Sequence, residues 1–456
     1  MVRLKEKRRS GLMDFDVLFL GSGQGAWNGA IPMAKAGLKV GVIEEGLFGG
    51  VCTNRGCNAK ITLDRPVELL RQVEHLQGRG FDSLPALNWH DLMAHKHEVI
   101  DSLAESNKQK LENAGVKTII GHGTFVDSHT IEVADTNYTA EKVVIVSGRL
   151  PHRLNIPGSE LFHDSTDFLV MEEMPERMTL IGGGYIAMEF ATIANAFGSD
   201  VTVILRGTKI LRDFHQPYVQ EVVNDLKRRG VKFQMKVTLE AAEQTENGIV
   251  LHGKEGYQHT TDYVIDATGR VPQTENMNFE GIGLEFDAVK GIPVNEYLET
   301  NLPGVYATGD ILDKKQPKIT PVAAYESQYL AHLFAGDTNQ PIVYPPIAYN
   351  VFTSPRIATA GITVEEAEQS PEKYKITAVD YAGKDWFHQV GNDEINKITF
   401  VYDKDDYMVG VTNVGNDAVE TVDGLLDVMN SKLKAPDQEE LIYIFPSIAH
   451  SYMKYI

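Results

Sequence analysis

The chain has 456 residues, of which 43% are hydrophobic and 23% charged, so we expect an ordinary globular protein of about two to four domains. Its 43 basic and 63 acidic side chains leave a net charge of −20, which argues against general binding to nucleic-acid phosphates. The sequence holds no apolar run of about 18 residues, so no membrane span is expected. The low count of 2 cysteines favours a reducing compartment, and we expect a cytoplasmic protein.

The N-terminal residues 1–12 form a basic cluster with no apolar segment behind it. This pattern is not that of a secretory signal. We expect a flexible, solvated tail, or upstream translation ahead of a natural start at Met13.

A first strand–turn–helix–strand pattern follows the tail. The apolar run Val17–Leu20 predicts a parallel strand buried on both faces, and Val40–Ile43 predicts a second strand that ends at Glu44. An acid at that place is suited to a ribose hydroxyl, so the segment predicts a dinucleotide site; the alternative is a tight turn in an unrelated α/β domain. The turn residues at the spacing G-x-G-x-x-A are Gly21, Gly23 and Ala26.

The same pattern returns in residues 178–205, and its second strand is Val201–Leu205. The acid is missing here: Arg206 follows the strand, and Arg212 lies six residues further on. Arginines pair with a 2′-phosphate, so the sequence favours NADPH over NADH, with ordinary surface charge as the alternative. The turn residues are Gly182, Gly184 and Ala187.

Two dinucleotide units in one chain indicate electron transfer from one bound nucleotide to another. The rest of the sequence predicts amphipathic helices at 65–76 and 95–111, short strands at 121–133, strand–turn segments at 264–272 and 304–310, and an α+β region after about 336. We therefore predict an α/β fold with two Rossmann-like domains. The predicted domains are 1–150 with 271–335, then 151–270, and a C-terminal α+β dimerisation domain at 336–456.

The only two cysteines, Cys52 and Cys57, lie in GLFGGVCTNRGCNAK. Residues i and i+5 of an ideal helix point about 140° apart, so a bond between them needs the irregular backbone that the intervening Asn and Gly tolerate. A helix beginning at Cys57 places its sulfur near a helix N-terminus, which lowers a thiol pKa, and Lys60 is then one turn on. Gly49 and Gly50 allow the chain to approach the first dinucleotide site closely.

Together, the motifs GSGQGA, GGVCTNRGCNAK, SGRLP, GGGYIAMEF, ATGRVP, ATGD and TPVA resemble those of the flavin-dependent pyridine nucleotide–disulfide oxidoreductases, the glutathione reductase and dihydrolipoamide dehydrogenase group. The resemblance covers nearly the whole chain. It implies FAD on the first unit, NADPH on the second and a homodimer. The cofactor-binding residues that it implies are Gly21, Gly23, Ala26, Glu44, Gly50, Gly148, Gly309, Asp310, Gly182, Gly184, Arg206, Arg212 and Gly269.

The resemblance also implies roles at the reacting groups. Lys60 and Glu189 resemble an ion pair beside the hydride-accepting flavin nitrogen, and Tyr185 resembles a gate over the flavin. Cys57 would contact the flavin, while Cys52 would be the thiol that attacks the substrate. No metal site is expected, since the chain has no further cysteine pair.

The C-terminal segment YIFPSIAH, residues 443–450, departs from the family pattern H-x-H-P-T-x-x-E. Phe445 stands in the place of the histidine that would complete the partner subunit's site, Tyr443 in that of the first histidine, and His450 in that of the glutamate. His450 could supply the proton or merely pack against the partner, and Tyr443, with an ordinary pKa near 10, is a poor base.

The leading prediction is an NADPH-driven reductase of a disulfide or another thiol-reactive small molecule. The alternatives are a reductase of a non-disulfide acceptor, such as a quinone or metal ion, and a flavin redox sensor with little turnover.

Overall fold

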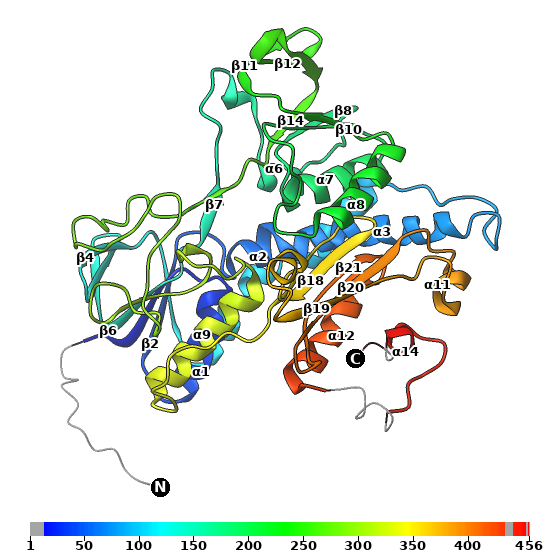
Figure 1. Cartoon of the computed structure of the whole chain (residues 1–456). Coiled ribbons are helices and arrows are strands. Elements are labelled where there is room, and N and C mark those ends of the chain that lie inside the picture. Colours follow the sequence, from blue (N-terminus) through cyan, green and yellow to red (C-terminus); the bar gives the residue numbers. More distant parts are fainter. Residues whose placement is uncertain (1–12, 434–440, 453–454, 456) are drawn as a thin grey trace. The chain divides into compact units, whose positions relative to one another are not determined.

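The computed structural model describes residues 13–433, 441–452 and 455, so the predicted tail lies outside the described residues (Figure 1). The described chain divides into two compact units. The first comprises 13–59, 97–151 and 270–343, and the second comprises the remaining described residues.

The first unit is built on a sheet of seven strands. The central strand β1 is parallel to β2 and β6, and its residues Val17–Leu20 are buried, as the apolar run predicts. Helices α1 and α9 lie side by side (Figure 1). The sheet order is β3 (Lys117–Ile120), β2 (Val40–Glu44), β1 (Phe15–Leu20), β6 (Thr136–Ile145), β5 (Thr130–Val133) and β4 (Thr124–Asp127), and β16 (Val305–Ala307) also pairs with β6.

The first unit also contains a second, smaller sheet and several helices. The strands β7 (Arg149–Pro151) and β15 (Arg270–Pro272) pair antiparallel and form a separate two-stranded sheet. The helical elements are α1 (Gln24–Lys35), α2 (Gly50–Arg55), the start of α3 (Cys57–His75), α5 (Leu103–Asn113), the 3-10 turn η3 (Gly309–Ile311) and α9 (Thr320–Ala335).

In the second unit, a parallel four-stranded sheet repeats the strand–turn–helix design and a three-stranded antiparallel sheet accompanies it. The parallel order is β10 (Lys232–Met235), β9 (Asp200–Leu205), β8 (Arg177–Ile181) and β14 (Tyr263–Asp266), and the antiparallel order is β11 (Leu239–Thr245), β12 (Gly248–Gly253) and β13 (Gln258–Thr261). The helical elements are η1 (Ser159–Leu161), α6 (Ser165–Leu169), α7 (Tyr185–Ala196), α8 (Gln216–Arg228) and η2 (Lys254–Gly256).

The C-terminal part of the second unit is an antiparallel five-stranded sheet with helices, which confirms the predicted α+β region. Its core joins the sheet to α12 through residues such as Phe400, Val422 and Leu425. The strand order is β17 (Ala348–Val351), β18 (Arg356–Gly361), β21 (Met408–Gly415), β20 (Asn396–Asp403) and β19 (Tyr374–Asp380). The helices are α10 (Val364–Glu368), α11 (Trp386–Gly391), α12 (Ala418–Ser431) and α14 (Ile448–Tyr452).

One helix prediction was wrong in its bounds. The predicted single helix at 95–111 is two helices, α4 (Trp89–Ile100) and α5, separated at Asp101 and Ser102. Short polar side chains of this kind compete with helical hydrogen bonding and favour helix ends, which explains the break.

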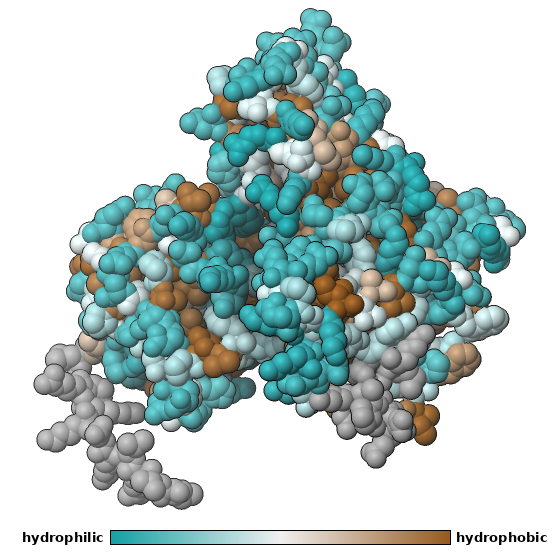
Figure 2. All heavy atoms as spheres, viewed as in Figure 1, coloured by the Kyte–Doolittle hydropathy of each residue, from teal (hydrophilic) through white to brown (hydrophobic). Residues whose placement is uncertain are grey.

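On the face shown in Figure 2, hydrophilic side chains dominate and apolar residues form small groups. Among the described residues, no helix combines the length and the apolar character that crossing a bilayer requires.

Candidate active site

The first glycine-rich turn joins β1 to α1. Gly21 has φ 110°, and a Cβ there would lie 2.5 Å from the carbonyl oxygen of Val146, so the fold requires glycine. A Cβ on Gly23 would meet nothing within 4 Å, and no side chain caps the helix. Ala26 follows on the buried face of α1. The N-terminus of α1 therefore has room for a pyrophosphate against its amides.

Glu44 ends β2, and its carboxylate bonds to the same turn. Ser22 donates to Oε2 from its main-chain nitrogen (3.0 Å) and from its hydroxyl (2.6 Å), while the nitrogen of Gly46 donates to Oε1 (2.8 Å). These three bonds hold the carboxylate of Glu44 against the glycine-rich turn. The sequence predicts Glu44 but not Ser22, which occupies a variable position of the motif.

The cysteine segment packs against this turn, as Gly49 and Gly50 predict. The nitrogen of Gly49 donates to the hydroxyl of Ser22 (3.1 Å). A Cβ on Gly50 would lie 2.8 Å from the Cα of Gly23. The start of α2 and the first turn are therefore in direct contact.

The two cysteines belong to different helices. Cys52 lies in α2, Cys57 begins α3, and Gly56 interrupts the helix with φ −152° and ψ −117°. Neither cysteine is in a disulfide; Cys52 is half-buried and Cys57 is exposed, with its Sγ 3.6 Å from Oγ1 of Thr320. A hydrogen bond with Cys57 and then burial raise the pKa of the Cys52 thiol. Cys52 therefore keeps its proton at neutral pH in this state, while the helix start favours a thiolate at Cys57.

Asp310 lies in the turn η3, which a buried ion pair holds. The nitrogen of Gly309 donates to Oε2 of Glu326 (2.7 Å), and Nζ of Lys314 donates to Oε1 of the same carboxylate (2.6 Å). Glu326 is fully buried in α9. Sequence reasoning missed this pair, although an acid in an otherwise apolar helical stretch was a usable signal.

Two other predicted glycines lie near strand ends with left-handed backbone. Gly148 has φ 73° after β6, and its carbonyl accepts from the nitrogen of Gln273 (3.0 Å). Gly269 has φ 147° after β14, and its carbonyl accepts from the nitrogen of His152 (3.0 Å).

The second glycine-rich turn repeats the first in geometry. Gly182 has φ 133°, and a Cβ there would collide with the carbonyl of Ala267, whereas a Cβ on Gly184 would meet nothing within 4 Å. No side chain caps α7. Arg206 and Arg212 are exposed, and within the described part of the chain neither has an ion-pair partner. Both are available to an anionic ligand.

Lys60 and Glu189 form the ion pair that the resemblance implies. Nζ of Lys60 donates to Oε1 of Glu189 (3.1 Å), and both side chains are largely buried. The main-chain nitrogen of Phe352 donates to the same oxygen (2.9 Å). Tyr185, one turn before Glu189 in α7, is half-exposed at the helix start.

The C-terminal segment presents apolar side chains to solvent in the single chain. Ile442, Ile444 and Phe445 are 100%, 80% and 64% exposed. The ring of His450 lies 5.0 Å from that of Phe445, and its main-chain nitrogen donates to the Ser447 hydroxyl (3.2 Å). His450 is therefore a direct neighbour of Phe445.

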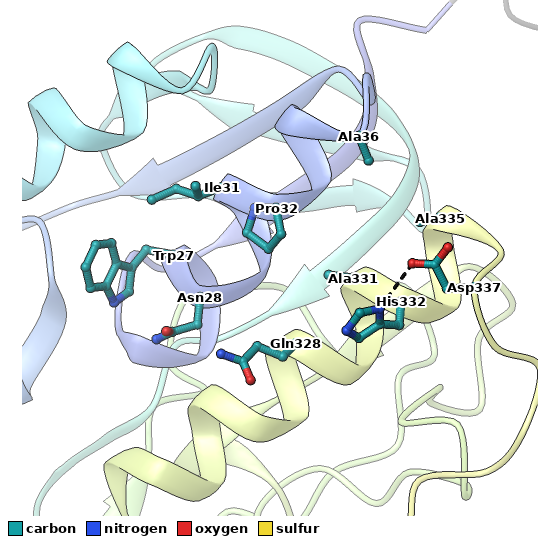
Figure 3. Close-up of a pocket in the computed structure, with 10 residues that line it drawn as sticks. All are labelled: Trp27, Asn28, Ile31, Pro32, Ala36, Gln328, Ala331, His332, Ala335 and Asp337. Carbon is teal, nitrogen blue, oxygen red and sulfur yellow. Dashed lines mark hydrogen bonds and ion pairs between the residues drawn. The ribbon is translucent and has the colours of Figure 1, made fainter.

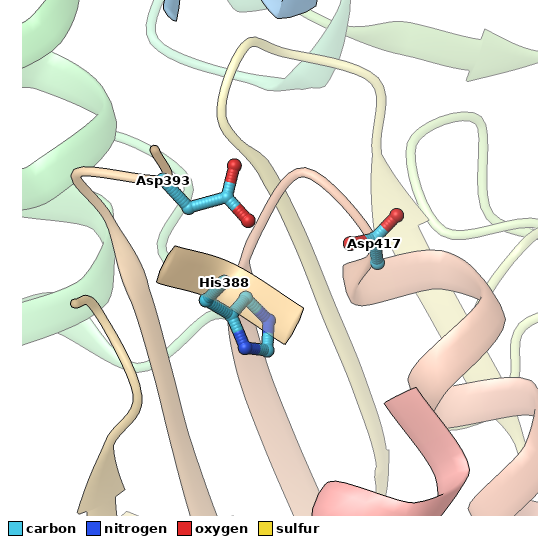
Figure 4. Close-up of side chains that lie close together, drawn as sticks. All are labelled: His388, Asp393 and Asp417. Carbon is cyan, nitrogen blue, oxygen red and sulfur yellow. The ribbon is translucent and has the colours of Figure 1, made fainter. Parts of the chain in front are cut away.

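Another titratable cluster lies in the C-terminal part of the second unit. His388, Asp393 and Asp417 gather there, and burial, followed by the charge of Asp393, raises the pKa of Asp417 to about 6 (Figure 4). Nδ1 of His388 bonds to Oδ1 of Asp385 (2.7 Å), and its Nε2 contacts the Asn396 amide. Since both ring nitrogens have protein partners, we interpret the cluster as a buried polar network.

A pocket of about 440 Å³ opens between α1 and α9 in the first unit (Figure 3). Trp27 and Asn28 line it from α1, and Gln328 and His332 from α9, where His332 bonds to Asp337 (3.1 Å). None of its lining residues is a predicted site residue, so the pocket is distinct from the residues described above.

Comparison with known proteins agrees with this architecture. The model of a family described as pyridine nucleotide-disulphide oxidoreductase matches residues 15–327, and that of its dimerisation domain matches 347–455. A glutathione reductase of Nostoc sp. is 30% identical, with 96% of this chain and 99% of that protein covered. A glutathione reductase of Burkholderia cepacia is 28% identical (96% and 98% covered), and a dihydrolipoyl dehydrogenase of Staphylococcus aureus 27% (97% and 96%).

Proposed function

Because the chain belongs to the pyridine nucleotide–disulphide oxidoreductase family, we propose that it is an FAD-dependent enzyme that carries electrons from NADPH through Cys52 and Cys57 to a small-molecule disulfide. The main support is the contact between the cysteine segment and the first glycine-rich turn, through Gly50 and Gly23. In the balanced reaction, NADPH, one proton and one disulfide give NADP⁺ and two thiols. When bound, FAD supplies two-electron transfer between a nicotinamide and a disulfide.

The proposal places one nucleotide at each of the two glycine-rich turns. In this proposal, Gly23 and Glu44 hold the pyrophosphate and ribose of FAD, and Asp310 holds its ribityl chain. The exposed Arg206 and Arg212 hold the 2′-phosphate of NADPH, since the second strand of that unit ends without an acid. The family as a whole binds FAD and a pyridine nucleotide, so the preference for NADPH rests on these arginines.

The two thiols have different tasks. Cys57, at the start of α3, faces the flavin as a thiolate. Cys52 loses its proton and attacks the substrate disulfide, which breaks the substrate S–S bond, releases the first substrate thiol and leaves a mixed disulfide on Cys52. Cys57 then attacks Cys52 Sγ, which releases the second substrate thiol and reforms the internal disulfide. Because the pKa of Cys52 is raised, its attack needs a base, and disulfide turnover should rise with pH above neutrality.

The buried pair Lys60 and Glu189 would lie beside the flavin, where the ammonium stabilises the reduced, anionic ring. Tyr185, half-exposed on the same helix as Glu189, would cover the nicotinamide site until NADPH enters. The dimerisation domain implies a homodimer. The exposed Ile442, Ile444 and Phe445 fit burial against a second subunit, whose site this segment would complete.

A second function, reduction of a quinone or metal ion, is favoured by one observation. By the family resemblance, Phe445 stands where the acid–base histidine is expected, and the raised pKa of the Cys52 thiol means that this thiol holds its proton. A group of this kind contributes about 10²–10⁴-fold in rate. An acceptor reduced directly at the flavin, or a disulfide with acidic thiols, would not need it.

NADPH consumption against a panel of acceptors separates these functions. We expect turnover with an aromatic disulfide, whose thiols leave readily, and its loss in Cys52→Ser at unchanged FAD content. Turnover of a quinone or ferric complex that survives in both Cys52→Ser and Cys57→Ser would establish the second function. FAD binding without turnover of any acceptor would leave the redox-sensor alternative.

Alkylation of the reduced protein tests which sulfur faces the flavin. In the flavin-free protein, iodoacetamide should modify Cys57, which is exposed, before Cys52, whose pKa is raised. Addition of FAD should reverse this order, because the flavin would cover Cys57. Peptide mass spectrometry measures the ratio, and an order that FAD leaves unchanged would contradict the assignment.

Phe445→His tests the missing acid–base group. The substitution should raise turnover of glutathione disulfide by about tenfold or more, since it restores a proton donor at neutral pH. Tyr443→His is the matched control, two residues away, and should change little. An unchanged rate in Phe445→His would show that another group already protonates the leaving thiol.

A further inference from the structure

A buried charge cluster lies behind the Lys60–Glu189 pair in the second unit. Asp64 follows Lys60 by one turn of α3 and is fully buried, and Arg356, 4% exposed, begins β18. Nη2 of Arg356 donates to Oδ2 of Asp64 (2.7 Å) and lies 3.2 Å from Oε2 of Glu68. One guanidinium therefore serves two carboxylates on one face of α3.

Phe352 connects this cluster to the Lys60–Glu189 pair. Nζ of Lys60 lies 3.5 Å from the centroid of its ring, and Cζ of Arg356 lies 4.9 Å from the same centroid. The main-chain nitrogen of Phe352 donates to Oε1 of Glu189, the oxygen that also accepts from Lys60. Lys60 and Arg356 thus both contact the Phe352 ring. The main chain of Phe352 in turn binds the carboxylate of Glu189.

The arrangement depends on Arg356. Burial raises the pKa of Asp64, while the charge of Arg356 acts in the opposite direction. Oδ1 of Asp64 is buried and has no hydrogen-bond partner among the described atoms. Without the guanidinium, Asp64 would be a buried and unpaired acid, and Phe352 would lose one of its two cation contacts.

We propose that Asp64 and Arg356 are positioning residues, which hold Phe352 and through it set Glu189 and Lys60 for electron transfer from NADPH. The inference rests on the proposed function, in which Lys60 and Glu189 lie beside the flavin. Neither residue touches a reacting atom in this account. Their effect reaches the site through the Phe352 main chain and through the electrostatic field on Lys60.

The test compares Arg356→Gln with Asp225→Asn. Asp225 is a buried acid of the same unit that bonds to Arg228 and Arg229, and none of its described contacts involves Phe352 or Glu189. Hydrogen exchange of the Phe352 amide is measured in the flavin-free protein, so this readout does not depend on activity. Stopped-flow absorbance then gives the rate of flavin reduction by NADPH at equal FAD content.

In Arg356→Gln we expect amide exchange at Phe352 about tenfold faster, flavin reduction about tenfold slower and a more negative flavin potential. The rate of thiol–disulfide exchange between the dithiol and a substrate disulfide should stay within about twofold of the wild-type rate. Asp225→Asn should lower thermal stability without these changes. If Arg356→Gln does not fold, Arg356→Lys serves, because it keeps the charge but not the paired contacts, and a smaller change in the same direction is expected.

The inference is overturned if either Phe352 exchange or flavin reduction in folded Arg356→Gln stays within twofold of the wild type, or if Arg356→Lys, used in its place, changes neither. It is also overturned if Asp225→Asn produces the same changes. Failure of flavin reduction in the wild type itself would instead overturn the proposed function, and the amide-exchange result would still decide whether Arg356 positions Phe352.

Discussion

The two glycine-rich turns have similar glycine geometry, but the strands that follow them end differently. Gly21 and Gly182 both adopt positive φ, and a side chain at either would strike a neighbouring carbonyl. Gly23 and Gly184 both border open space. The second strands differ: β2 ends in Glu44, which is bonded to the turn, whereas β9 ends in the buried Leu205 and the exposed Arg206 follows it. The comparison teaches that the first glycine serves the fold and the second leaves open space beside the helix start; in our proposal, the residue at the strand end selects the nucleotide.

The largest effect should come from substituting the two glycines of the first turn one at a time. Gly21→Ala forces a strained backbone and a collision with Val146, so we expect a loss of about 2 kcal/mol or more in the free energy of unfolding, and loss of FAD. Gly23→Ala should change stability by less than about 0.5 kcal/mol yet weaken FAD binding about tenfold. Denaturation of the flavin-free proteins and FAD titration measure both, and equal stability losses would break the comparison.

A smaller effect should come from Arg206, which follows β9 in the second unit. Arg206→Gln removes the charge that we propose pairs with the 2′-phosphate, so kcat/KM for NADPH should fall about 10–100-fold while that for NADH hardly changes. Lys254→Gln, an exposed cation of the same unit, is the control. Equal kinetics with the two coenzymes in the wild type would show that Arg206 is ordinary surface charge.

The smallest effect concerns Ser22. Ser22→Ala removes the hydroxyl that donates to Glu44 (2.6 Å) but keeps the main-chain donor, so we expect FAD affinity to fall about fivefold. Ser199→Ala, which removes a buried hydroxyl of the second unit, should leave FAD affinity unchanged. Fluorescence titration of the flavin measures both affinities. An unaltered affinity in Ser22→Ala would mean that the hydrogen bond from the Ser22 hydroxyl to Glu44 does not contribute to FAD binding.

The sequence predicts those parts of the molecule that local pattern determines. The buried strand Val17–Leu20, the turn spacing and the helix that starts at Cys57 all follow from periodicity and from glycine positions. The Lys60–Glu189 pair joins residues 129 positions apart, and only the family resemblance indicated it.

The partners of other charged side chains could not be predicted, because they depend on tertiary packing. Glu326 contacts Gly309 across the end of β16, and Arg356 contacts Asp64 from 292 positions away. The sequence contains no periodic signal for such pairs. The break at Asp101, by contrast, had a local cause, since two short polar residues interrupt the amphipathic pattern there.

The break at Gly56 has a mechanical consequence. A disulfide brings two sulfurs to about 2 Å, whereas reduced thiols need more than about 3 Å, so each turnover must move one sulfur. With Cys52 on the six-residue α2 and Cys57 on the long α3, the shorter helix can swing at that single joint. We therefore expect the long helix, which carries Lys60, to move less than α2 while the sulfurs open and close. Crystals of the oxidised and reduced forms should therefore differ more in α2 than in α3.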